Sequence, residues 1–359
     1  MVKAKGKKRA EKRRKPPRRR SSDTAPHPQL MWGLSALVVA LIGVAVGLYA
    51  TNQRPSEQYV REPDFSCENE HDDIECTKFA KAGECERNPG WMAVKCARAC
   101  GDCSLLNPGV RCTPENTNMS TVPGLKPGGI NRMFERWFQD PAYAKYSPEI
   151  ITRPPEGPWV VMLHNFVSDE EIDAVLSKSG TLKRSTDQGA FNEHGVQDQV
   201  VSSTRTSTNA WCTHACASDP HVKSLVKRIE GVTGIPKRNY ESFQVLRYEP
   251  GQYYRRHHDT SLGDFQLLSG PRVLTFFLYF NDVEAGGGTE FTDLGITVNP
   301  RKGSALVWPS VTDDLDDIDM RAHHAALEVK KGVKYGANSW IHLYDYETPN
   351  LWGCTGSFA

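Results

Sequence analysis

Two side chains in the segment 247–259 could bind a metal ion, His257 and Asp259. The segment is predicted to be a β-strand, and residues two apart on a strand point to the same face of a sheet. His258 lies between them and competes as a ligand, although its side chain would point to the opposite face. A neutral imidazole and a carboxylate on one face suit a divalent transition metal. Because chance could produce so short a motif, a further ligand is needed.

A later pair of histidines includes His324. With His257 and Asp259 it would complete the 2-His-1-carboxylate triad, which binds Fe(II) and leaves coordination positions open for substrates. The predicted strand that carries His324 is followed by a turn and then by Lys334. We expect an antiparallel return that brings Lys334 near His324. A lysine is otherwise a solvated surface group, but at this place its ammonium could pair with an anionic co-substrate.

Short strands must position these residues, and they are predicted from Ser242 onward. Their ranges are Ser242–Tyr248, Gln252–Asp259, Val273–Phe280, Gly287–Thr292, Ser304–Trp308, His323–Val329 and Lys334–Tyr344. Short strands separated by turn residues at this spacing indicate a sandwich or barrel. Upstream, a capping box at Ser168–Glu171 begins a predicted helix, and a second helix is expected at Ser224–Ile229. We therefore predict a mainly β fold with flanking helices.

Six of the ten cysteines lie between residues 67 and 103. So small a segment cannot bury enough apolar surface to fold unaided, and three disulfides are the expected source of its stability. A zinc site is the alternative use of these cysteines, but it suits an oxidising compartment poorly. Six cysteines allow about fifteen pairings, and their spacing alone does not choose among them.

The first 50 residues have a composition of their own. Residues 1–20 hold twelve Lys or Arg, and residues 31–50 carry no charge. As a helix, twenty apolar residues span about 30 Å, the thickness of a bilayer's hydrocarbon core. A buried soluble helix and a cleaved signal peptide are the alternatives, but Leu48–Ala50 is a poor cleavage site. We predict a basic cytosolic tail (1–30), a transmembrane signal anchor (31–50) and a polar stalk (51–65).

This arrangement predicts a single-pass type II membrane protein whose remaining residues are lumenal. The endoplasmic reticulum membrane is the expected location, and the Golgi is the alternative. Ten cysteines suit a lumenal domain, and Asn118-Met-Ser120 is a glycosylation sequon. A basic run could also bind nucleic acid, but beyond residue 20 Asp and Glu outnumber Lys and Arg and form no basic stripe. No nucleic-acid partner is predicted.

The cysteine-rich segment 66–103 resembles the ShK-toxin-like (ShKT) domain. The resemblance is carried by the spacing from Cys76 to Cys85, by Asn88–Met92, and by Cys96-Ala-Arg-Ala-Cys100-Gly-Asp-Cys103. It implies the disulfides Cys67–Cys103, Cys76–Cys96 and Cys85–Cys100. Channel blocking is one role of the family, whereas an accessory or protein-contact role is expected for a module attached to an enzyme.

Residues 159–345 resemble the catalytic domain of the membrane-anchored prolyl 4-hydroxylases, which are Fe(II)/2-oxoglutarate dioxygenases. The matching stretches occur in the family's order: Arg205–Ser207, Gln244–Gln252, His257–Asp259, Arg272–Thr275, Gly286–Phe291, Pro300–Leu306, His324–Lys334 and Trp340–His342. The resemblance implies a double-stranded β-helix (jelly-roll) core in a dioxygenase domain over 151–347. A linker (104–150), ordered at Met133–Trp137, would precede it, and a C-terminal tail (348–359) would follow it.

The resemblance also implies roles for individual residues. His257, Asp259 and His324 would bind iron; Lys334 would bind the far carboxylate of 2-oxoglutarate, helped by Tyr248 and Thr289. The residues expected in or beside the peptide groove are Tyr254, Arg272, Trp340 and His342. The histidines expected to face away from the metal are His258 and His323.

Some features depart from the family pattern. Thr260–Leu262 stands where the family commonly has an aromatic pair, which affects the expected substrate contacts rather than iron binding. Disulfides are expected at Cys212 and Cys216, and also at Cys112 and Cys354, rather than metal binding through His214, with partners left open. The polar segment Gly189–Val200 could fold over an extended peptide or be a plain surface loop.

The predicted activity is 4-hydroxylation of proline in secretory proteins, with Fe(II) as cofactor and 2-oxoglutarate and O₂ as co-substrates. The family resemblance also implies ascorbate, which would rescue oxidised iron. Succinate and CO₂ would be the co-products. Hydroxylation of peptidyl lysine by the same core is one alternative. A surface binding protein that acts through the ShKT module is another, although retention of all three ligands and Lys334 argues against it.

Overall fold

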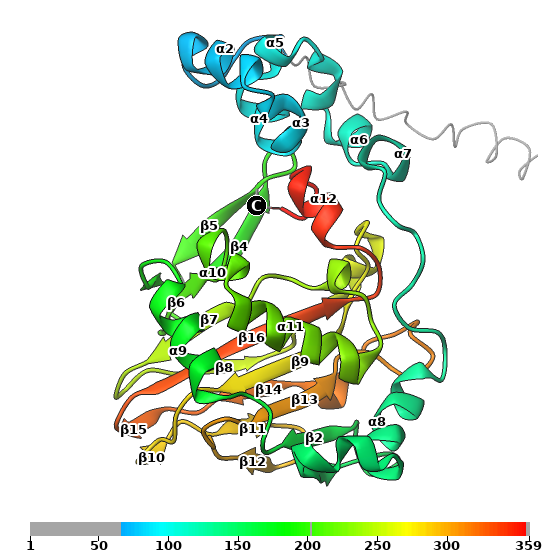
Figure 1. Cartoon of the computed structure of the whole chain (residues 1–359), viewed down its shortest axis with the longest axis vertical. Helices are drawn as coiled ribbons and strands as arrows, with labels where there is room; N and C mark the ends of the chain where they lie inside the picture. Colours follow the sequence, from blue (N-terminus) through cyan, green and yellow to red (C-terminus); the bar gives the residue numbers. More distant parts are fainter. Residues whose placement is uncertain (1–65, 202, 357–359) are drawn as a thin grey trace, which may run out of the picture. The chain divides into compact units, whose positions relative to one another are not determined.

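The computed structural model describes residues 66–201 and 203–356 (Figure 1). The predicted cytosolic tail, signal anchor and stalk lie outside these residues. Among the described residues, no helix has both the length and the apolar character needed to cross a membrane.

The cysteine-rich region folds as a group of short helices around a small disulfide core. Its elements are α2 (Asp73–Lys81), α3 (Glu84–Arg87), α4 (Pro89–Lys95), α5 (Ala97–Cys100) and the 3₁₀-helix η1 (Cys103–Leu106). The structure contains the disulfides Cys67–Cys103, Cys76–Cys96 and Cys85–Cys100, the three pairs that the ShKT resemblance implies. Cys76, Met92 and Cys96 are fully buried beneath Phe79 and Trp91. The cystine bonds therefore form much of this core.

An eight-stranded antiparallel sheet organises the rest of the described chain. Its strands, in spatial order, are β1 (Pro148–Thr152), β2 (Val160–Leu163), β13 (Ala305–Pro309), β9 (Arg272–Tyr279), β16 (Lys334–His342), β7 (Gln244–Tyr248), β6 (Thr208–Trp211) and β3 (Lys183–Arg184). One face packs against α8 (Gly129–Gln139), α9 (Asp169–Lys178) and α11 (Pro220–Thr233), and Figure 1 shows α9 and α11 over this face. A helix-covered sheet agrees with the predicted mainly β fold with flanking helices.

A four-stranded sheet lies against the other face. Its order is β12 (Ile296–Val298), β11 (Thr289–Phe291), β14 (His324–Ala326) and β8 (Tyr254–His257). One hydrophobic cluster contains Tyr248, Phe277 and Tyr279 from the large sheet together with Phe291 and Val298 from the small one. Because both sheets contribute to one cluster, their inner faces enclose a common space.

The remaining elements are short. They comprise α6 (Pro108–Arg111), α7 (Pro114–Thr117), α10 (Ala215–Ser218), α12 (Glu347–Leu351), η2 (Pro141–Tyr146), η3 (Lys237–Asn239), η4 (Leu262–Gln266), η5 (Met320–Ala322), and the strand pairs β4 (Thr186–Phe191) with β5 (Gln197–Val201) and β10 (Ala285–Gly286) with β15 (Val329–Lys331). Two disulfides pair the cysteines whose partners the sequence left open: Cys112–Cys354 and Cys212–Cys216.

The two predicted helices are confirmed. Ser168 and Glu171 form the predicted capping box at the start of α9. The Glu171 carboxylate also accepts two hydrogen bonds from Arg228 on α11, at 2.6 and 2.8 Å. The capping residue thus also joins two helices that cover the sheet.

The segment 104–150, predicted as a linker, contains a core helix. On α8 the side chains of Ile130, Met133, Phe134 and Trp137 are at most 3% exposed. Their spacing places them on one helix face. The segment's content of Pro, Gly and Asn concealed this periodicity, although Met133–Trp137 was expected to be ordered.

The expected hairpin between His324 and Lys334 is wrong. β14 pairs with β8 and β11, whereas β16 pairs with β7 and β9, so the two residues lie in different sheets. In β16, Lys334 lies opposite Tyr248 of β7. The chain crosses between sheets after β15, which pairs with β10 instead of with β16. Lys334 therefore faces the common space from the opposite sheet.

We predict that Trp137→Ala lowers the free energy of unfolding by about 3–5 kcal/mol, as for other buried aromatic residues. Trp137 is 1% exposed, and its indole N–H donates to the Val232 carbonyl of α11 at 2.9 Å. The neighbouring Phe138 is 39% exposed, so Phe138→Ala is the matched control and should cost much less. Urea unfolding with disulfides intact measures both. Equal costs would contradict a core position for α8.

Candidate metal centre and its surroundings

The three predicted ligands meet between β8 and the start of β14. His324 is the direct cross-strand partner of His257, and Asp259 follows β8 by two residues. The Asp259 carboxylate lies 3.9 Å from His257 Nε2 and 3.6 Å from His324 Nε2. One ligand atom from each residue lies within 4.8 Å of the others. Among the described residues, these three side chains form the one group of His, Cys, Asp or Glu residues that could hold a metal ion.

Hydrogen bonds orient both imidazoles. Nδ1 of His257 donates to the Arg255 carbonyl at 2.8 Å, and Nδ1 of His324 donates to the Ala322 carbonyl at 3.0 Å. Since each carbonyl can only accept, Nδ1 carries a proton in each ring, and Nε2 is the nitrogen turned toward Asp259. Two imidazoles that present Nε2, together with a carboxylate, match the donor set of non-haem Fe(II) sites.

The protonation states at neutral pH also suit metal binding. Burial, with the neighbouring His324, lowers the pKa of His257 to about 3. Burial opposes ionisation of Asp259, but His324, His257 and the hydrogen bond from Thr275 outweigh it and lower the pKa of Asp259 to about 2. Thr275 Oγ1 donates to Asp259 Oδ2 at 2.6 Å. No proton therefore has to leave these two ligands at pH 7.

His258 and His323 lie outside the triad, as expected. Their rings face each other at 5.0 Å. His258 Nε2 lies 3.1 Å from the Asp319 carbonyl, and His323 Nδ1 donates to the Met320 carbonyl at 2.6 Å. The alternation along β8 thus separates His257 from His258.

Lys334 is a buried cation in the same inter-sheet space. The residue is 1% exposed, and its Nζ has no hydrogen-bond partner among the described residues. Aromatic rings surround the ammonium, with centroids at 4.9 Å for Phe277, 5.5 Å for Tyr279 and 5.6 Å for Tyr248. Burial lowers the pKa of Lys334 to about 7. An unpaired buried ammonium is costly, and an anionic ligand would supply the missing partner.

Thr289 adds a hydroxyl to the surroundings of Lys334. Its Oγ1 lies 2.8 Å from the hydroxyl of Tyr279, whose ring also faces Lys334. Thr289 is two residues before Phe291, the cross-strand partner of His324. Lys334, Tyr248 and Thr289 therefore gather in one region, between the triad's sheet and the large sheet.

Of the four residues expected at the peptide groove, Tyr254 and Arg272 contact the triad, and Trp340 and His342 lie beside Arg272. Tyr254 stacks on His257 with ring centroids 3.6 Å apart. Arg272 Nη1 donates to the Asp259 carbonyl at 3.1 Å, and its guanidinium lies 4.0 Å from the Trp340 ring centroid. His342 lies on the same strand as Trp340, two residues further on.

Glu241 joins two of these residues and was missed by sequence reasoning. Its Oε1 accepts from Arg272 Nε at 2.5 Å and from His342 Nε2 at 2.9 Å. Glu241 is 6% exposed; burial opposes its ionisation, but Arg272 and His342 outweigh this and lower its pKa to about 2. No pattern near Glu241 signals this role, because both partners are distant in the sequence.

Arg205 was also given no role, although it lies in a matching stretch. It is 7% exposed, its guanidinium lies 4.8 Å from the Tyr254 ring centroid, and Nη2 donates to Gln244 Oε1 at 2.6 Å. Arg205 therefore packs behind Tyr254, which in turn covers His257.

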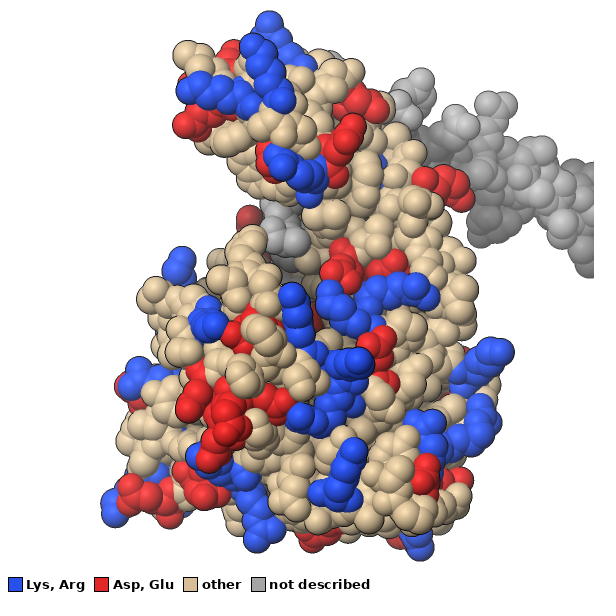
Figure 2. Space-filling view, in the orientation of Figure 1, with Lys and Arg blue, Asp and Glu red and all other residues tan. Residues whose placement is uncertain are grey.

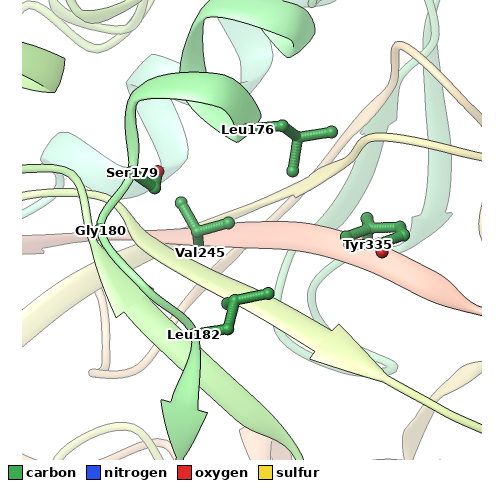
Figure 3. A pocket seen from close by; sticks show the side chains of 6 residues that line it. All are labelled: Leu176, Ser179, Gly180, Leu182, Val245 and Tyr335. Carbon is green, nitrogen blue, oxygen red and sulfur yellow. The ribbon is translucent and has the colours of Figure 1, made fainter.

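A cavity of about 320 Å³ lies elsewhere, on the helix-covered face of the large sheet (Figure 3). Its lining includes Leu176 and Ser179 at the end of α9, and Val245 and Tyr335 from the sheet. Val245 belongs to the cluster under the helices, whereas the adjacent Leu246 belongs to the inter-sheet cluster. The sheet therefore separates this cavity from the triad.

Two family models match the chain. The 2OG-Fe(II) oxygenase superfamily model matches residues 243–342, which include the triad and Lys334. The ShK domain-like model matches residues 66–103. The first family implies Fe(II), 2-oxoglutarate and O₂ as cofactor and co-substrates.

The chain is also similar to known prolyl 4-hydroxylases. It is 32% identical over 249 residues to prolyl 4-hydroxylase 1 of Arabidopsis thaliana, covering 63% of this chain and 84% of that protein. It is 34% identical over 190 residues to prolyl 4-hydroxylase subunit alpha-2 of Gallus gallus, covering 52% of this chain but 34% of that subunit. A solved structure of viral collagen prolyl hydroxylase from Paramecium Bursaria Chlorella virus-1, a 2OG complex, shows 26% identity, covers 51% of this chain and 95% of that one, and has a TM-score of 0.40.

We predict that His257→Ala weakens binding of Co(II), used as an O₂-stable probe of the site, by more than about 100-fold. Loss of an outer-shell partner alone typically costs about 10–100-fold, and His257 is placed as a direct ligand. The adjacent His258→Ala is the control and should leave the affinity within about threefold. Calorimetric titration of both variants measures the difference, and equal losses would contradict the triad.

The similarity to the Arabidopsis enzyme extends over most of that protein's length, and the described fold places the expected ligands together. The chain belongs to the prolyl 4-hydroxylase family.

Proposed function

We propose that this protein hydroxylates peptidyl proline at C4, using Fe(II), 2-oxoglutarate and O₂. The observation that carries the proposal is the pairing of a metal triad with an unpartnered buried lysine in one inter-sheet space. The triad fits Fe(II), and Lys334 fits a second carboxylate of a dicarboxylate co-substrate. The two sheets would be the halves of a double-stranded β-helix.

Each residue would have a defined task. His257, Asp259 and His324 would hold Fe(II), and Thr275 would keep the Asp259 carboxylate oriented through its hydrogen bond. Bound Fe(II) supplies the oxidation, in which 2-oxoglutarate and O₂ become succinate and CO₂ and one oxygen atom enters the C4–H bond of proline. Lys334, which is 1% exposed and surrounded by aromatic rings, would bind the far carboxylate.

Aromatic side chains beside the triad support a proline-rich peptide as substrate. Tyr254 stacks on the ligand His257, and Trp340 packs on Arg272, which contacts Asp259. Aromatic grooves recognise extended proline-rich segments. The Trp340 indole N–H is buried and has no acceptor within the described part of the chain. It could donate to a peptide carbonyl, which a proline-rich segment still offers. Peptidyl lysine remains the alternative substrate for the same core.

The site of action is proposed to be the secretory lumen, with the chain anchored by residues 31–50 as a type II protein in the endoplasmic reticulum, or alternatively in the Golgi. All ten cysteines form disulfides, which persist in oxidising compartments. Asn118 is exposed and could carry a glycan. Ascorbate would keep the iron reduced. Lys and Arg are interspersed with Asp and Glu on the face shown in Figure 2, and no continuous basic stripe runs across that face.

The activity is tested with residues 51–359, Fe(II), 2-oxoglutarate, ascorbate and a proline-rich peptide that also contains lysine. We expect mass spectrometry to find a gain of one oxygen on proline and a matching yield of succinate. His324→Ala should reduce the yield by more than about 1,000-fold, whereas the control His323→Ala should retain most of it. Oxygen on lysine alone would favour the alternative substrate. If no peptide yields a hydroxylated product, the proposed enzymatic activity is contradicted.

We predict that 2-oxoglutarate binding weakens as the pH rises above about 7. The pKa of Lys334 is lowered to about 7, so the ammonium is increasingly lost above that pH in the free protein. Each further pH unit should raise the Kd up to about tenfold, until the pKa of the complex is reached. Calorimetry at pH 6.5 and 8.5, with Mn(II) in the site and without O₂, measures the Kd for 2-oxoglutarate.

Two lysine variants serve as controls for that prediction. Lys334→Met should bind 2-oxoglutarate weakly and without this pH dependence. Lys330→Met changes an exposed lysine four residues earlier and should retain the wild-type profile. A profile unchanged in Lys334→Met would show that another group binds the carboxylate.

A further inference from the structure

Arg111 is a buried arginine that no catalytic role explains. It is the last residue of α6, just before Cys112, and it is 0% exposed. Its guanidinium donates to backbone carbonyls from three separate segments: Nη1 to Leu105 at 2.6 Å and Leu106 at 3.4 Å, Nη2 to His194 at 2.6 Å, and Nε to Trp352 at 3.0 Å. We call this set of contacts the Arg111 junction. An arginine is suited to it, because its donors lie in a rigid planar fork.

One of the three segments is the tip of the β4–β5 hairpin, which contains His194. A second contact holds this tip, since the Gln197 backbone N–H donates to the Gly356 carbonyl at 2.9 Å. Gly195 lies in the same turn with φ +74°, and a Cβ there would lie 3.1 Å from Cβ of Pro108. The tip is therefore packed against the segment that follows the disulfide-rich domain and against the C-terminal segment. Figure 1 shows β4 and β5 running from the sheet toward α12.

The other end of the hairpin reaches the metal site. After β5, the Thr204 carbonyl accepts from the Arg255 N–H at 2.9 Å, and Arg205 forms a β-bridge with Tyr254. Tyr254 is the residue that stacks on His257. At the start of the hairpin, Asp187 accepts from the Thr204 hydroxyl at 3.3 Å. The hairpin therefore connects the edge of the triad's strand to the Arg111 junction.

The hairpin has little support of its own between these ends. It forms a separate two-stranded sheet, and isolated two-stranded ribbons are marginally stable. It exposes three large apolar side chains: Phe191 at 55%, Val200 at 51% and Val201 at 67%. Its direction depends on its two attachments, and the rest of the hairpin leaves these apolar side chains uncovered.

We propose that Arg111 is a positioning residue, which ties the hairpin tip to residues 104–112, the connector that follows the disulfide-rich domain, and thereby sets the affinity of the site for its peptide. The proposal rests on the proposed function, since the occupant is the peptide to be hydroxylated. It assigns the ShKT module a mechanical role within this protein: its connector is the fixed point from which the hairpin is held.

The disulfide Cys112–Cys354 makes the junction testable. It joins the residue after Arg111 to the residue two beyond Trp352. Loss of the guanidinium therefore leaves the connector and the C-terminal segment linked, and the hairpin tip loses its attachment to the connector while the contact between Gln197 and Gly356 remains. Arg111→Ala removes all four hydrogen bonds, and Arg111→Lys keeps a charge but replaces the fork with a single ammonium.

Gly195→Ala acts on the same contact from the hairpin side. The new Cβ would be strained at positive φ and crowded by Pro108, while Arg111 and the ShKT module are unchanged. Arg87→Ala is the control, because Arg87 is an exposed arginine of the same module that also donates to a backbone carbonyl, that of Ala82.

The experiment measures hydrogen exchange and peptide affinity on residues 51–359. We expect protection of the amides of 186–201 to fall at least about tenfold in Arg111→Ala and Gly195→Ala, as for loss of a charge-assisted hydrogen bond. The Kd for a proline-rich peptide, measured by calorimetry with Mn(II) and 2-oxoglutarate without O₂, should rise about tenfold. Arg111→Lys should be intermediate, and Arg87→Ala unchanged. The Kd for 2-oxoglutarate should stay the same in all variants.

The outcomes separate this proposal from the activity. Unchanged protection of 186–201 in both variants, or lost protection with unchanged peptide Kd, would overturn the positioning role. Because the peptide Kd does not require turnover, a wild-type protein that binds the peptide without hydroxylating it would contradict only the proposed function. A weaker 2-oxoglutarate affinity in the same variants would show general loss of structure and would also overturn the proposal.

Discussion

The cost of burying charged groups between two sheets is the constraint on which the rest of the structure depends. Lys334 has no partner for its ammonium among the described residues, and Asp259 is 7% exposed. Such burial is unfavourable unless ligands complete the pairing. The free energy for it comes from the apolar packing around the site, including Phe277, Tyr279 and Phe291, which both sheets share. The fold holds these charges in place before any ligand arrives, so binding requires little rearrangement.

Support of the site reaches well beyond the ligands. The ligand Asp259 is held by Thr275 through its side chain and by Arg272 through its backbone carbonyl. Arg272 is in turn held by Glu241, which also binds His342. Positive and negative charges therefore alternate from the metal ligand outward, and each buried charge has its neighbour as a partner. Substitution of Glu241 would leave the buried Arg272 without its carboxylate partner, and Arg272 in turn contacts Asp259.

Local patterns predicted the parts of the structure that depend on local geometry. Strand alternation separated His257 from His258, and the capping box located the start of α9. The position of Lys334 shows the limit, because its role followed from a resemblance while its expected hairpin was wrong. A strand's partner depends on the whole sheet order, which neighbouring residues do not encode. Glu241 and Arg111 were missed for the same reason, since all their key partners but Leu105 and Leu106 are far away in the sequence.

The bond between Cys112 and Cys354 closes a covalent ring around the whole region that contains the sheets and the triad. A protease that cuts one exposed loop within this ring would leave two pieces joined by the bond, and the packed sheets would hold them in register. Nicked molecules should therefore keep the size and much of the function of intact ones until the disulfide is reduced. Such a ring makes resistance to single cuts a property of the chain's connectivity, independent of the thermodynamic stability of its core.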